Sequence, residues 1–120
     1  KNDHVIILGD FNIAPEDRDV HAPEEWKGCN LVSQAERNEL NKILACGFSD
    51  CFRSFDQPNK SFSWWDYRAA GFKRNRGLRI DLILASNSLT KRCSSSYIDT
   101  EPRKLVRPSD HTPVIAVFDL

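Results

Sequence analysis

Methionine is absent from all 120 residues of the chain, including position 1. The chain opens instead at Lys1, and an apolar, strand-like run begins only a few residues later at Val5. Translation starts with methionine, and so we expect this sequence to be a processed or excised piece of a longer protein.

Long apolar runs and an excess of either charge are also missing. No run approaches the roughly 20 residues of a membrane span, and the first one ends at Gly9 and Asp10, too short for a signal peptide. The 17 basic residues balance the 17 acidic ones, so any nucleic-acid footprint must be local. With 40% apolar and 28% charged residues, the composition predicts one soluble globular domain without membrane association.

The four cysteines lack C-x-x-C spacing, and no histidine lies at a zinc-like interval from them. They therefore predict reduced thiols in a cytoplasmic protein rather than disulfides or a zinc site. The sequence also lacks a glycine-rich phosphate loop and a serine in a nucleophile elbow. These absences argue against a nucleotide-cradling loop and against a serine hydrolase.

Hydrophobic patterning predicts an α/β domain. Residues 5–8 form a continuous apolar run, which is typical of a strand buried on both faces of a sheet. A capping-box pattern from Ser33 to Glu36 predicts one long helix that ends before Gly47. The polar residues 14–30 are expected to form a surface loop without an assigned role. Further strands are expected near residues 61–67, 79–85, 94–100 and 114–118.

An acid and an imidazole, Asp110 and His111, stand side by side just before the last apolar run. Pro108 and Pro113 flank them and restrict the backbone on both sides, which holds the pair in a rigid bend. Such a pair at the edge of a strand can serve acid–base or metal chemistry. Considered alone, the pattern favours a hydrogen-bonded structural histidine, but two other segments reverse that interpretation.

The first of these segments places Asp10 and Asn12 directly after the first strand. The carboxyl end of a strand is where α/β sheets bind ligands. Side chains two residues apart in extended chain point the same way, so the pair can hold a phosphate oxygen and a water. The structural alternative is an Asx turn that ends the strand.

The second segment contains Asp81, which is flanked by apolar residues in a predicted strand. A charge in such a place is costly to bury unless it is paired. One hypothesis is an ion pair with Arg76 or Arg79. The other places Asp81 behind His111, where a carboxylate fixes the tautomer of the imidazole and favours its protonated form.

A basic and aromatic tract extends from residue 64 to residue 79. Residues 68–79 contain five cations and no acid, and aromatic side chains are interleaved with them. Cations grip a phosphate backbone and aromatic rings stack on bases, so the tract predicts nucleic-acid contact. The alternative is a solvated loop beside ordinary core aromatics. Together, the acids, the amide and the histidine suit a divalent metal ion and a water attacking a phosphate.

Four segments, taken in order, resemble the bacterial exonuclease III family of abasic-site endonucleases, within the endonuclease/exonuclease/phosphatase superfamily. Three shared motifs have the forms Asp-x-Asn, Arg-x-Asp and Ser-Asp-His. Two longer stretches point more narrowly to the DNA-repair branch. The segments are Gly9-Asp10-Phe11-Asn12, Phe62-Ser63-Trp64-Trp65-Asp66-Tyr67-Arg68, Asn75-Arg76-Gly77-Leu78-Arg79-Ile80-Asp81-Leu82 and Pro108-Ser109-Asp110-His111-Thr112-Pro113-Val114.

The resemblance implies a role for each catalytic residue. Asp10 would handle the proton of the attacking water or the leaving oxygen, and Asn12 would hold the scissile phosphate. Asp81 and His111 would form a dyad that contacts this phosphate and the water. The implied cofactor is Mg²⁺ or Mn²⁺. Its expected ligands are Asp10, Asn12, Asp110 and His111.

The resemblance also implies a DNA interface for double-stranded DNA with abasic sites or 3′ ends. Trp64, Leu78 and Ile80 would line a pocket for the extruded abasic sugar. The complete expected set of DNA contacts is Trp64, Tyr67, Arg68, Asn75, Arg76, Leu78, Arg79 and Ile80.

The implied fold is the C-terminal half of a four-layer α/β sandwich over residues 1–120, with a mixed, mostly antiparallel sheet and about one long helix. The N-terminal half, with the family's main metal-binding glutamate, is expected to be missing. We therefore expect a cytoplasmic, monomeric complete enzyme that cleaves 5′ to abasic sites and trims 3′ ends. The chain alone is expected to have little activity.

Two alternatives remain open from the sequence. The catalytic motifs also fit another phosphodiesterase or phosphatase of the superfamily, such as a phosphoinositide phosphatase or an RNA-directed nuclease. The other alternative is a non-catalytic module that binds nucleic acid or dimerises, since a lone half would expose apolar surface.

Overall fold

The computed structural model describes residues 3–120 of the chain. Within these residues, the three α-helices are α1 (Pro23–Trp26), α2 (Gln34–Ala45) and α3 (Asn87–Thr90), and single 3₁₀ turns occur at Asp17–Asp19, Phe52–Ser54, Arg68–Ala70 and Glu101–Lys104. The strands are β1 (Ile6–Asp10), β2 (Phe48–Asp50), β3 (Trp64–Trp65), β4 (Gly77–Leu78), β5 (Asp81–Ser86), β6 (Cys93–Ile98) and β7 (Val114–Phe118).

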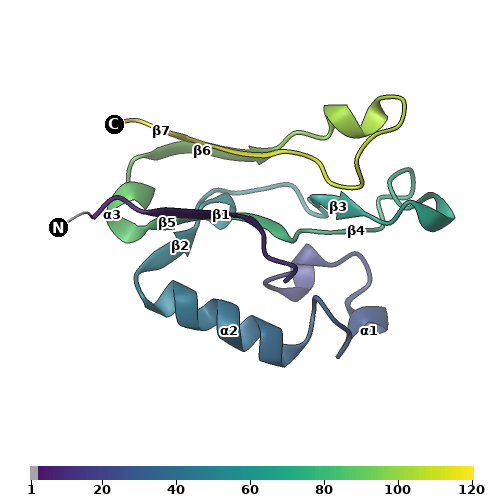
Figure 1. Cartoon of the computed structure of the whole chain (residues 1–120), viewed down its shortest axis with the longest axis horizontal. Coiled ribbons are helices and arrows are strands. Elements are labelled where there is room, and N and C mark those ends of the chain that lie inside the picture. The colour runs from purple at the N-terminus through teal and green to yellow at the C-terminus, as the bar shows by residue number, and fades with distance from the viewer. Residues whose placement is uncertain (1–2) are drawn as a thin grey trace.

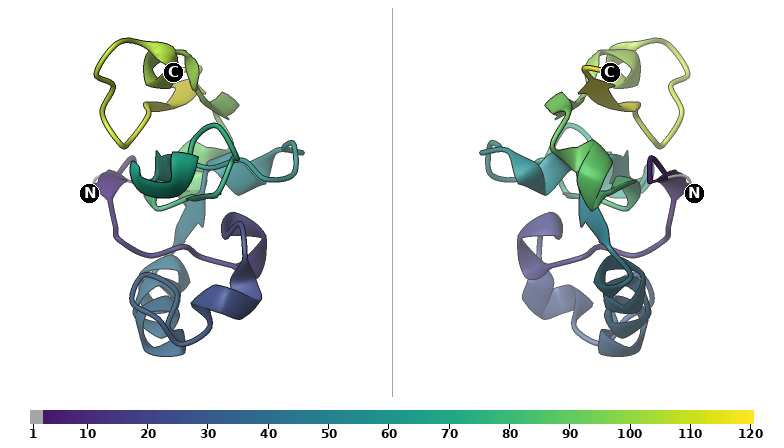
Figure 2. Two further views of the ribbon diagram at one scale, coloured as in Figure 1. Left: turned by 90° about the vertical axis from the view of Figure 1, so that its right-hand side faces the viewer. Right: turned by 90° about the vertical axis from the view of Figure 1, so that its left-hand side faces the viewer.

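The strands form three small antiparallel groups, ordered β1-β5-β2, β3-β4 and β6-β7. Helix α2 lies along one side of the β1-β5-β2 sheet, and the β6-β7 hairpin lies along the other (Figure 1). The end-on views show the same three levels, with the hairpin, the central strands and the helix stacked in turn (Figure 2). The fold is therefore α/β with antiparallel pairing and one long helix, as predicted.

Helix α2 forms where the sequence predicts it. The Ser33 hydroxyl accepts a hydrogen bond from the Glu36 backbone N–H, and the Glu36 carboxylate accepts one from the Ser33 backbone, which completes the capping box. Gly47 ends the helical segment with a φ of 106°, a conformation that glycine adopts without strain. The helix therefore has a defined start and stop that depend only on local chemistry.

Strand β5 is the centre of the fold because it contacts both neighbouring layers. Leu82 and Leu84 are buried in one cluster with Leu40 of α2. Alternate residues of a strand point to opposite faces, and Ala85 and Ile83 accordingly pack in a second cluster that includes side chains of β6 and β7. Asp81 continues this second face, and so its carboxylate points toward the hairpin layer.

The apolar run at residues 5–8 is not buried on both faces, contrary to the prediction. The side chains of Val5, Ile6, Ile7 and Leu8 are 37–66% exposed. Strand β1 lies at the edge of its sheet and pairs only with β5 within residues 3–120. The run has the composition of a buried strand but lacks covering layers in this chain.

Residues 14–30 are only partly a surface loop. Ala14, Asp19 and Val20 are at most 4% exposed, and Val20 joins a buried cluster with Leu78 and Ile80. Between residues 61 and 67, only Trp64–Trp65 pair as a strand, with β4. None of the helices within residues 3–120 is long and apolar enough to cross a membrane.

A buried ion-pair network ties residues 14–30 to the sheet. Arg79 is 1% exposed, and its Nε lies 2.7 Å from Asp19 Oδ1, while its Nη2 lies 2.5 Å from Asp50 Oδ2. Arg53 Nη2 makes a further 2.5 Å contact with Asp19 Oδ1. The guanidinium carbon of Arg79 also lies 4.8 Å from the centre of the Phe52 ring. Arg79 is therefore a structural cation that links three segments.

Candidate active site

Asp10 and Asp81 are brought together by strand register. Asp10 is the last residue of β1, Asp81 is the first residue of β5, and the two are direct cross-strand partners. Cross-strand partners project to the same face of a sheet with Cβ atoms about 4.5–5.5 Å apart. The antiparallel pairing of two strands therefore places two carboxylates side by side.

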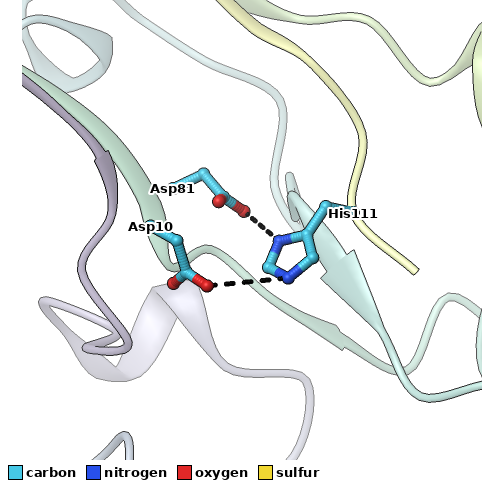
Figure 3. Close-up of side chains that lie close together, drawn as sticks. All are labelled: Asp10, Asp81 and His111. Atoms are coloured by element: carbon cyan, nitrogen blue, oxygen red, sulfur yellow. Dashed lines mark hydrogen bonds and ion pairs between the residues drawn. The ribbon is translucent and has the colours of Figure 1, made fainter. Parts of the chain in front are cut away.

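The imidazole of His111 lies between these carboxylates (Figure 3). His111 Nδ1 lies 2.8 Å from Asp81 Oδ2, and Nε2 lies 3.6 Å from Asp10 Oδ2. The predicted contact between Asp81 and His111 is thus present, and the alternative ion pair of Asp81 with an arginine is not. Arg79 pairs with Asp19 and Asp50, as described above, and Arg76 pairs with Glu25.

The loop that carries His111 is docked against β3 by main-chain contacts. Trp64 and His111 form an isolated antiparallel bridge. Three further hydrogen bonds hold the loop on either side: Trp65 N to Asp110 O at 3.1 Å, Thr112 N to Ser63 O at 2.8 Å, and Tyr67 Oη to Pro108 O at 2.8 Å. The position of the imidazole therefore depends on β3 as much as on the flanking prolines.

The surroundings of His111 favour its charged form. Burial lowers the pKa of His111, but the hydrogen bond to Asp81 and the negative charges of Asp81, Asp10 and Asp110 together raise the pKa above 6.5. With Nδ1–H donating to Asp81, the neutral ring carries its proton on Nδ1 and leaves Nε2 free to face Asp10.

Burial dominates at Asp81. It raises the pKa of this carboxyl above 3.8, although hydrogen bonds from His111 and Ser63 oppose the shift, and the nearby charge of Asp10 adds to it. The Asp81 side chain is 14% exposed, whereas the Asp10 side chain is 37% exposed. The site thus has one sheltered carboxylate behind the imidazole and one accessible carboxylate in front of it.

The same three side chains have the chemistry of a divalent-cation site. Ligand atoms of Asp10, Asp81 and His111 all lie within 4.8 Å of one another. Carboxylate oxygens suit Mg²⁺ and Mn²⁺, and an imidazole can join them. Two of the predicted ligands, Asp10 and His111, belong to this group, and Asp81 joins them although we expected it only in catalysis.

The other two predicted ligands lie beside this group. Asp110 Oδ2 accepts a 3.0 Å hydrogen bond from the indole Nε1–H of Trp64, which fixes one carboxylate oxygen. Asn12 has a φ of 53°, and its backbone N–H donates a 2.9 Å hydrogen bond to Asp10 Oδ1. The Asx turn that was the structural alternative therefore exists, and it leaves the Asn12 side chain exposed beside Asp10.

The basic and aromatic tract divides into exposed and buried residues. Leu78, Arg79 and Ile80 are at most 2% exposed, because their side chains are enclosed by the core or by ion pairs. Their contact with DNA stays a prediction, and their burial does not favour it. The charge partners of Arg79 are Asp19 and Asp50, which are distant from it along the chain. A count of charges within the basic tract therefore does not reveal them. Five predicted DNA contacts remain accessible: Trp64, Tyr67, Arg68, Asn75 and Arg76.

An open pocket of about 570 Å³ lies beside Trp64. Its lining includes His21 and Trp26 from residues 14–30, together with Arg68 and Arg76 from the basic tract. We assigned no role to residues 14–30 from the sequence, and no local pattern there identifies His21 or Trp26. Ser63 was likewise missed, although it lies within a segment that carried the resemblance.

This arrangement defines a class of protein, an α/β fold with antiparallel sheets in which two carboxylates at the ends of paired strands face one imidazole. The model of the Endonuclease/Exonuclease/phosphatase family matches residues 1–111, and the chain belongs to this family.

Comparisons with individual proteins lead to the same family. The chain is 39% identical to Exodeoxyribonuclease III of Haemophilus influenzae over 98% of its own length and 47% of that protein. It superposes with a TM-score of 0.96 and 40% identity on the 3′ phosphatase NExo from Neisseria bound to a product DNA hairpin, covering 100% of this chain and 47% of that one. For an AP endonuclease from Archaeoglobus fulgidus the TM-score is 0.90 at 38% identity, covering 98% and 46%. The chain thus spans about half the length of these relatives.

Proposed function

We propose that this chain carries part of the active site of a DNA repair nuclease that hydrolyses phosphodiester bonds. The observation that supports this most directly is the imidazole of His111 between Asp81, at 2.8 Å, and Asp10, at 3.6 Å. An imidazole with one sheltered and one accessible carboxylate can move a proton and stabilise negative charge on a phosphate oxygen.

Each residue has a distinct task in this proposal. Asp81 holds the Nδ1–H tautomer of His111 and supports the imidazolium form. His111 directs its Nε2 side toward the scissile phosphate. Asp10 exchanges a proton with the attacking water or the leaving oxygen, and Asn12 contacts the same phosphate through its exposed amide. Proton transfer by a positioned side chain contributes a factor of about 10²–10⁴ to the rate.

The carboxylates of Asp10 and Asp81, together with the neutral form of His111, fit Mg²⁺ or Mn²⁺, and Asn12 and Asp110 lie beside them. A bound divalent ion would supply charge neutralisation at the phosphate and lower the pKa of a water. The relatives are about twice as long as this chain, and we expect the remainder to supply further ligands.

The proposed substrate is double-stranded DNA with an abasic site or a damaged 3′ end. Lys73 and Arg74 form no ion pair within the described residues, and Arg68 and Arg76 have exposed carboxylate partners that a phosphate can replace. Tyr67, 62% exposed, offers an aromatic face beside these cations. The proposal extends to a monomeric, cytoplasmic complete enzyme.

The deciding experiment is Mg²⁺-dependent nicking of a duplex with a single abasic site. The chain is assayed alone and together with the part of the Haemophilus influenzae relative that it does not match, and both are compared with Asp10→Asn. Asp119→Asn is the control, because this exposed aspartate follows β7 outside the site. We expect cleavage only when the two parts are combined. In the combined form, Asp10→Asn should lose cleavage and Asp119→Asn should retain it. No cleavage of abasic or 3′-blocked DNA by the combined form contradicts the proposal.

A substrate panel separates this function from the two alternatives. Cleavage of a phosphoinositide or of RNA, but of neither abasic nor 3′-blocked DNA, would favour another hydrolase of the family. Binding of DNA without any cleavage, together with a dimer in light scattering, would favour the non-catalytic module, for which the exposed apolar face of β1 is the expected contact.

A further inference from the structure

Ser63 is a fully buried serine that lies directly before β3, with 0% of its surface exposed. Its hydroxyl oxygen accepts hydrogen bonds from the backbone N–H groups of Ile80 and Asp81, each at 3.1 Å. The Ser63 hydroxyl also lowers the pKa of the Asp81 carboxyl, against the larger rise that burial causes. A serine hydroxyl has one donor and two acceptor positions, and both acceptor positions are used here.

The backbone of Ser63 holds the other half of the site. The carbonyl of Ser63 accepts a 2.8 Å hydrogen bond from the N–H of Thr112, the residue that follows His111. The N–H of Ser63 donates a 3.0 Å hydrogen bond to the carbonyl of Leu78. One residue therefore contacts both the start of β5, which carries Asp81, and the loop that carries His111.

We propose that Ser63 is the positioning residue of the Asp81–His111 pair. It touches neither substrate nor metal, because it is buried, and acts through the two residues that it holds in place. The proposal rests in part on the proposed nuclease function, but the geometry that it explains is present in the chain itself.

The contacts predict that a residue without a hydroxyl would not serve in this position. Without the hydroxyl, the backbone N–H groups of Ile80 and Asp81 lose their acceptor. The backbone at Ile80 and Asp81 then has no fixed partner on this side. The Asp81–His111 contact of 2.8 Å is as short as charge-assisted hydrogen bonds are, and it weakens with small displacements of either residue.

The first test follows the imidazole and needs no DNA cleavage. The chain contains three histidines, so the ring signals can be assigned in ¹⁵N-labelled protein by substitution of each. In metal-free wild-type protein we expect a downfield, slowly exchanging Nδ1–H signal of His111. Ser63→Ala should lose or shift this signal, and Ser63→Thr, which keeps the hydroxyl, should retain it.

The matched control is Ser33→Ala. It removes another hydrogen-bonding hydroxyl, the half-buried cap of α2, and destabilises the fold without touching the site. The His111 signals are compared at temperatures below the unfolding transition of each variant. If the His111 signal in Ser63→Ala stays as in the wild type, or if folded Ser63→Thr behaves like Ser63→Ala, the proposal fails.

The second test is kinetic and uses the chain combined with the missing part of the relative. Loss of a residue that orients a catalytic group costs about 10–100-fold. We expect this loss in kcat for Ser63→Ala, with KM nearly unchanged, recovery in Ser63→Thr, and wild-type kcat in Ser33→Ala. Equal kcat in all variants overturns the proposal. If the wild type cleaves nothing, the proposed function fails, and the His111 signal still decides the role of Ser63.

Discussion

Asp10 and Asp81 are direct cross-strand partners, and one imidazole faces both of them. The two acids nevertheless have different surroundings, since the carboxylate of Asp81 is sheltered and hydrogen-bonded whereas that of Asp10 is accessible. Groups whose environments differ in this way can take different roles in acid–base chemistry. The predictions below follow from this asymmetry and from the network that supports it.

Asp81→Asn should lower kcat on abasic DNA by a factor on the order of 10²–10⁴ in the combined protein. The amide keeps the shape of the side chain but removes the negative charge, so it supports neither the Nδ1–H tautomer nor the charged imidazole of His111. Steady-state kinetics measure the effect, and circular dichroism checks the fold. An unchanged kcat in Asp81→Asn would return this residue to a structural role.

The stability of the metal-free chain should fall as the pH rises above 6.5. The folded state raises the pKa of His111 above this ordinary value, so the folded state binds more protons than the unfolded state in the window between the two values. The contribution is therefore fully present below pH 6.5 and is lost as the pH rises through the folded pKa. Burial raises the pKa of Asp81 above 3.8, and this adds a loss in the same direction at lower pH.

Urea denaturation of the chain in the presence of a chelator, at a series of pH values, measures this dependence. His111→Gln removes the titrating ring and should flatten the curve above pH 6.5. The difference between the wild-type and His111→Gln curves isolates the contribution of His111, because the two proteins share all their other titratable groups. A wild-type curve that rises in this window relative to His111→Gln would contradict the prediction.

Asp19→Ala should destabilise the fold by about 3–5 kcal/mol, because it leaves the buried guanidinium of Arg79 without one of its partners. Glu101→Ala is the control, since the Glu101 side chain is 75% exposed and pairs with Lys104 at the surface. An exposed pair contributes about 0–1 kcal/mol. Urea unfolding midpoints measure both changes, and similar losses in the two variants would argue against a special role for the Asp19–Arg79 network.

Much of this fold could be predicted from local sequence patterns. Helix α2 depends on its own capping box and apolar spacing, and both lie within a few residues. Strands β5, β6 and β7 were expected close to their observed bounds for the same reason. The contact between Asp81 and His111 was also predictable, because an acid in an apolar strand needs a partner.

What could not be predicted depends on distant partners. A cation within a basic tract looks like a DNA contact, but Arg79 is enclosed by Asp19, which lies 60 residues away along the chain. The apolar run of β1 has a composition that indicates burial, and yet this chain provides no layer over it. The contacts of Ser63 were hidden because a serine next to a strand is common, and its backbone partners, residues 78, 80, 81 and 112, are distant along the chain.

Thiol reactivity should separate the cysteines of the folded chain. Burial raises the pKa of Cys51 to about 12, and contacts with Cys93 and Asp50 add to this shift. The thiolate is the reactive form, so Cys51 should resist iodoacetamide until the protein unfolds. Cys29 and Cys46 are exposed and should be modified first. Peptide mapping by mass spectrometry resolves the order, and early modification of Cys51 in native protein would be inconsistent with its burial.

Trp64→Phe should lower kcat about 10-fold in the combined protein while leaving the affinity for DNA nearly unchanged. Phenylalanine keeps an aromatic face for contact with DNA but removes the indole N–H that holds Asp110 Oδ2 at 3.0 Å.

The control is Trp65→Phe, which removes a similar 3.0 Å hydrogen bond, from Trp65 Nε1 to Asn75, away from Asp10, Asp81 and His111. Trp65 is 1% exposed, so its substitution should cost more stability and less kcat than that of Trp64. We measure kcat at temperatures below the unfolding transitions of both variants and DNA affinity in the presence of a chelator. These two measurements separate effects on catalysis and binding from effects on stability. Equal losses of kcat would mean that the indole N–H does not position Asp110 for catalysis.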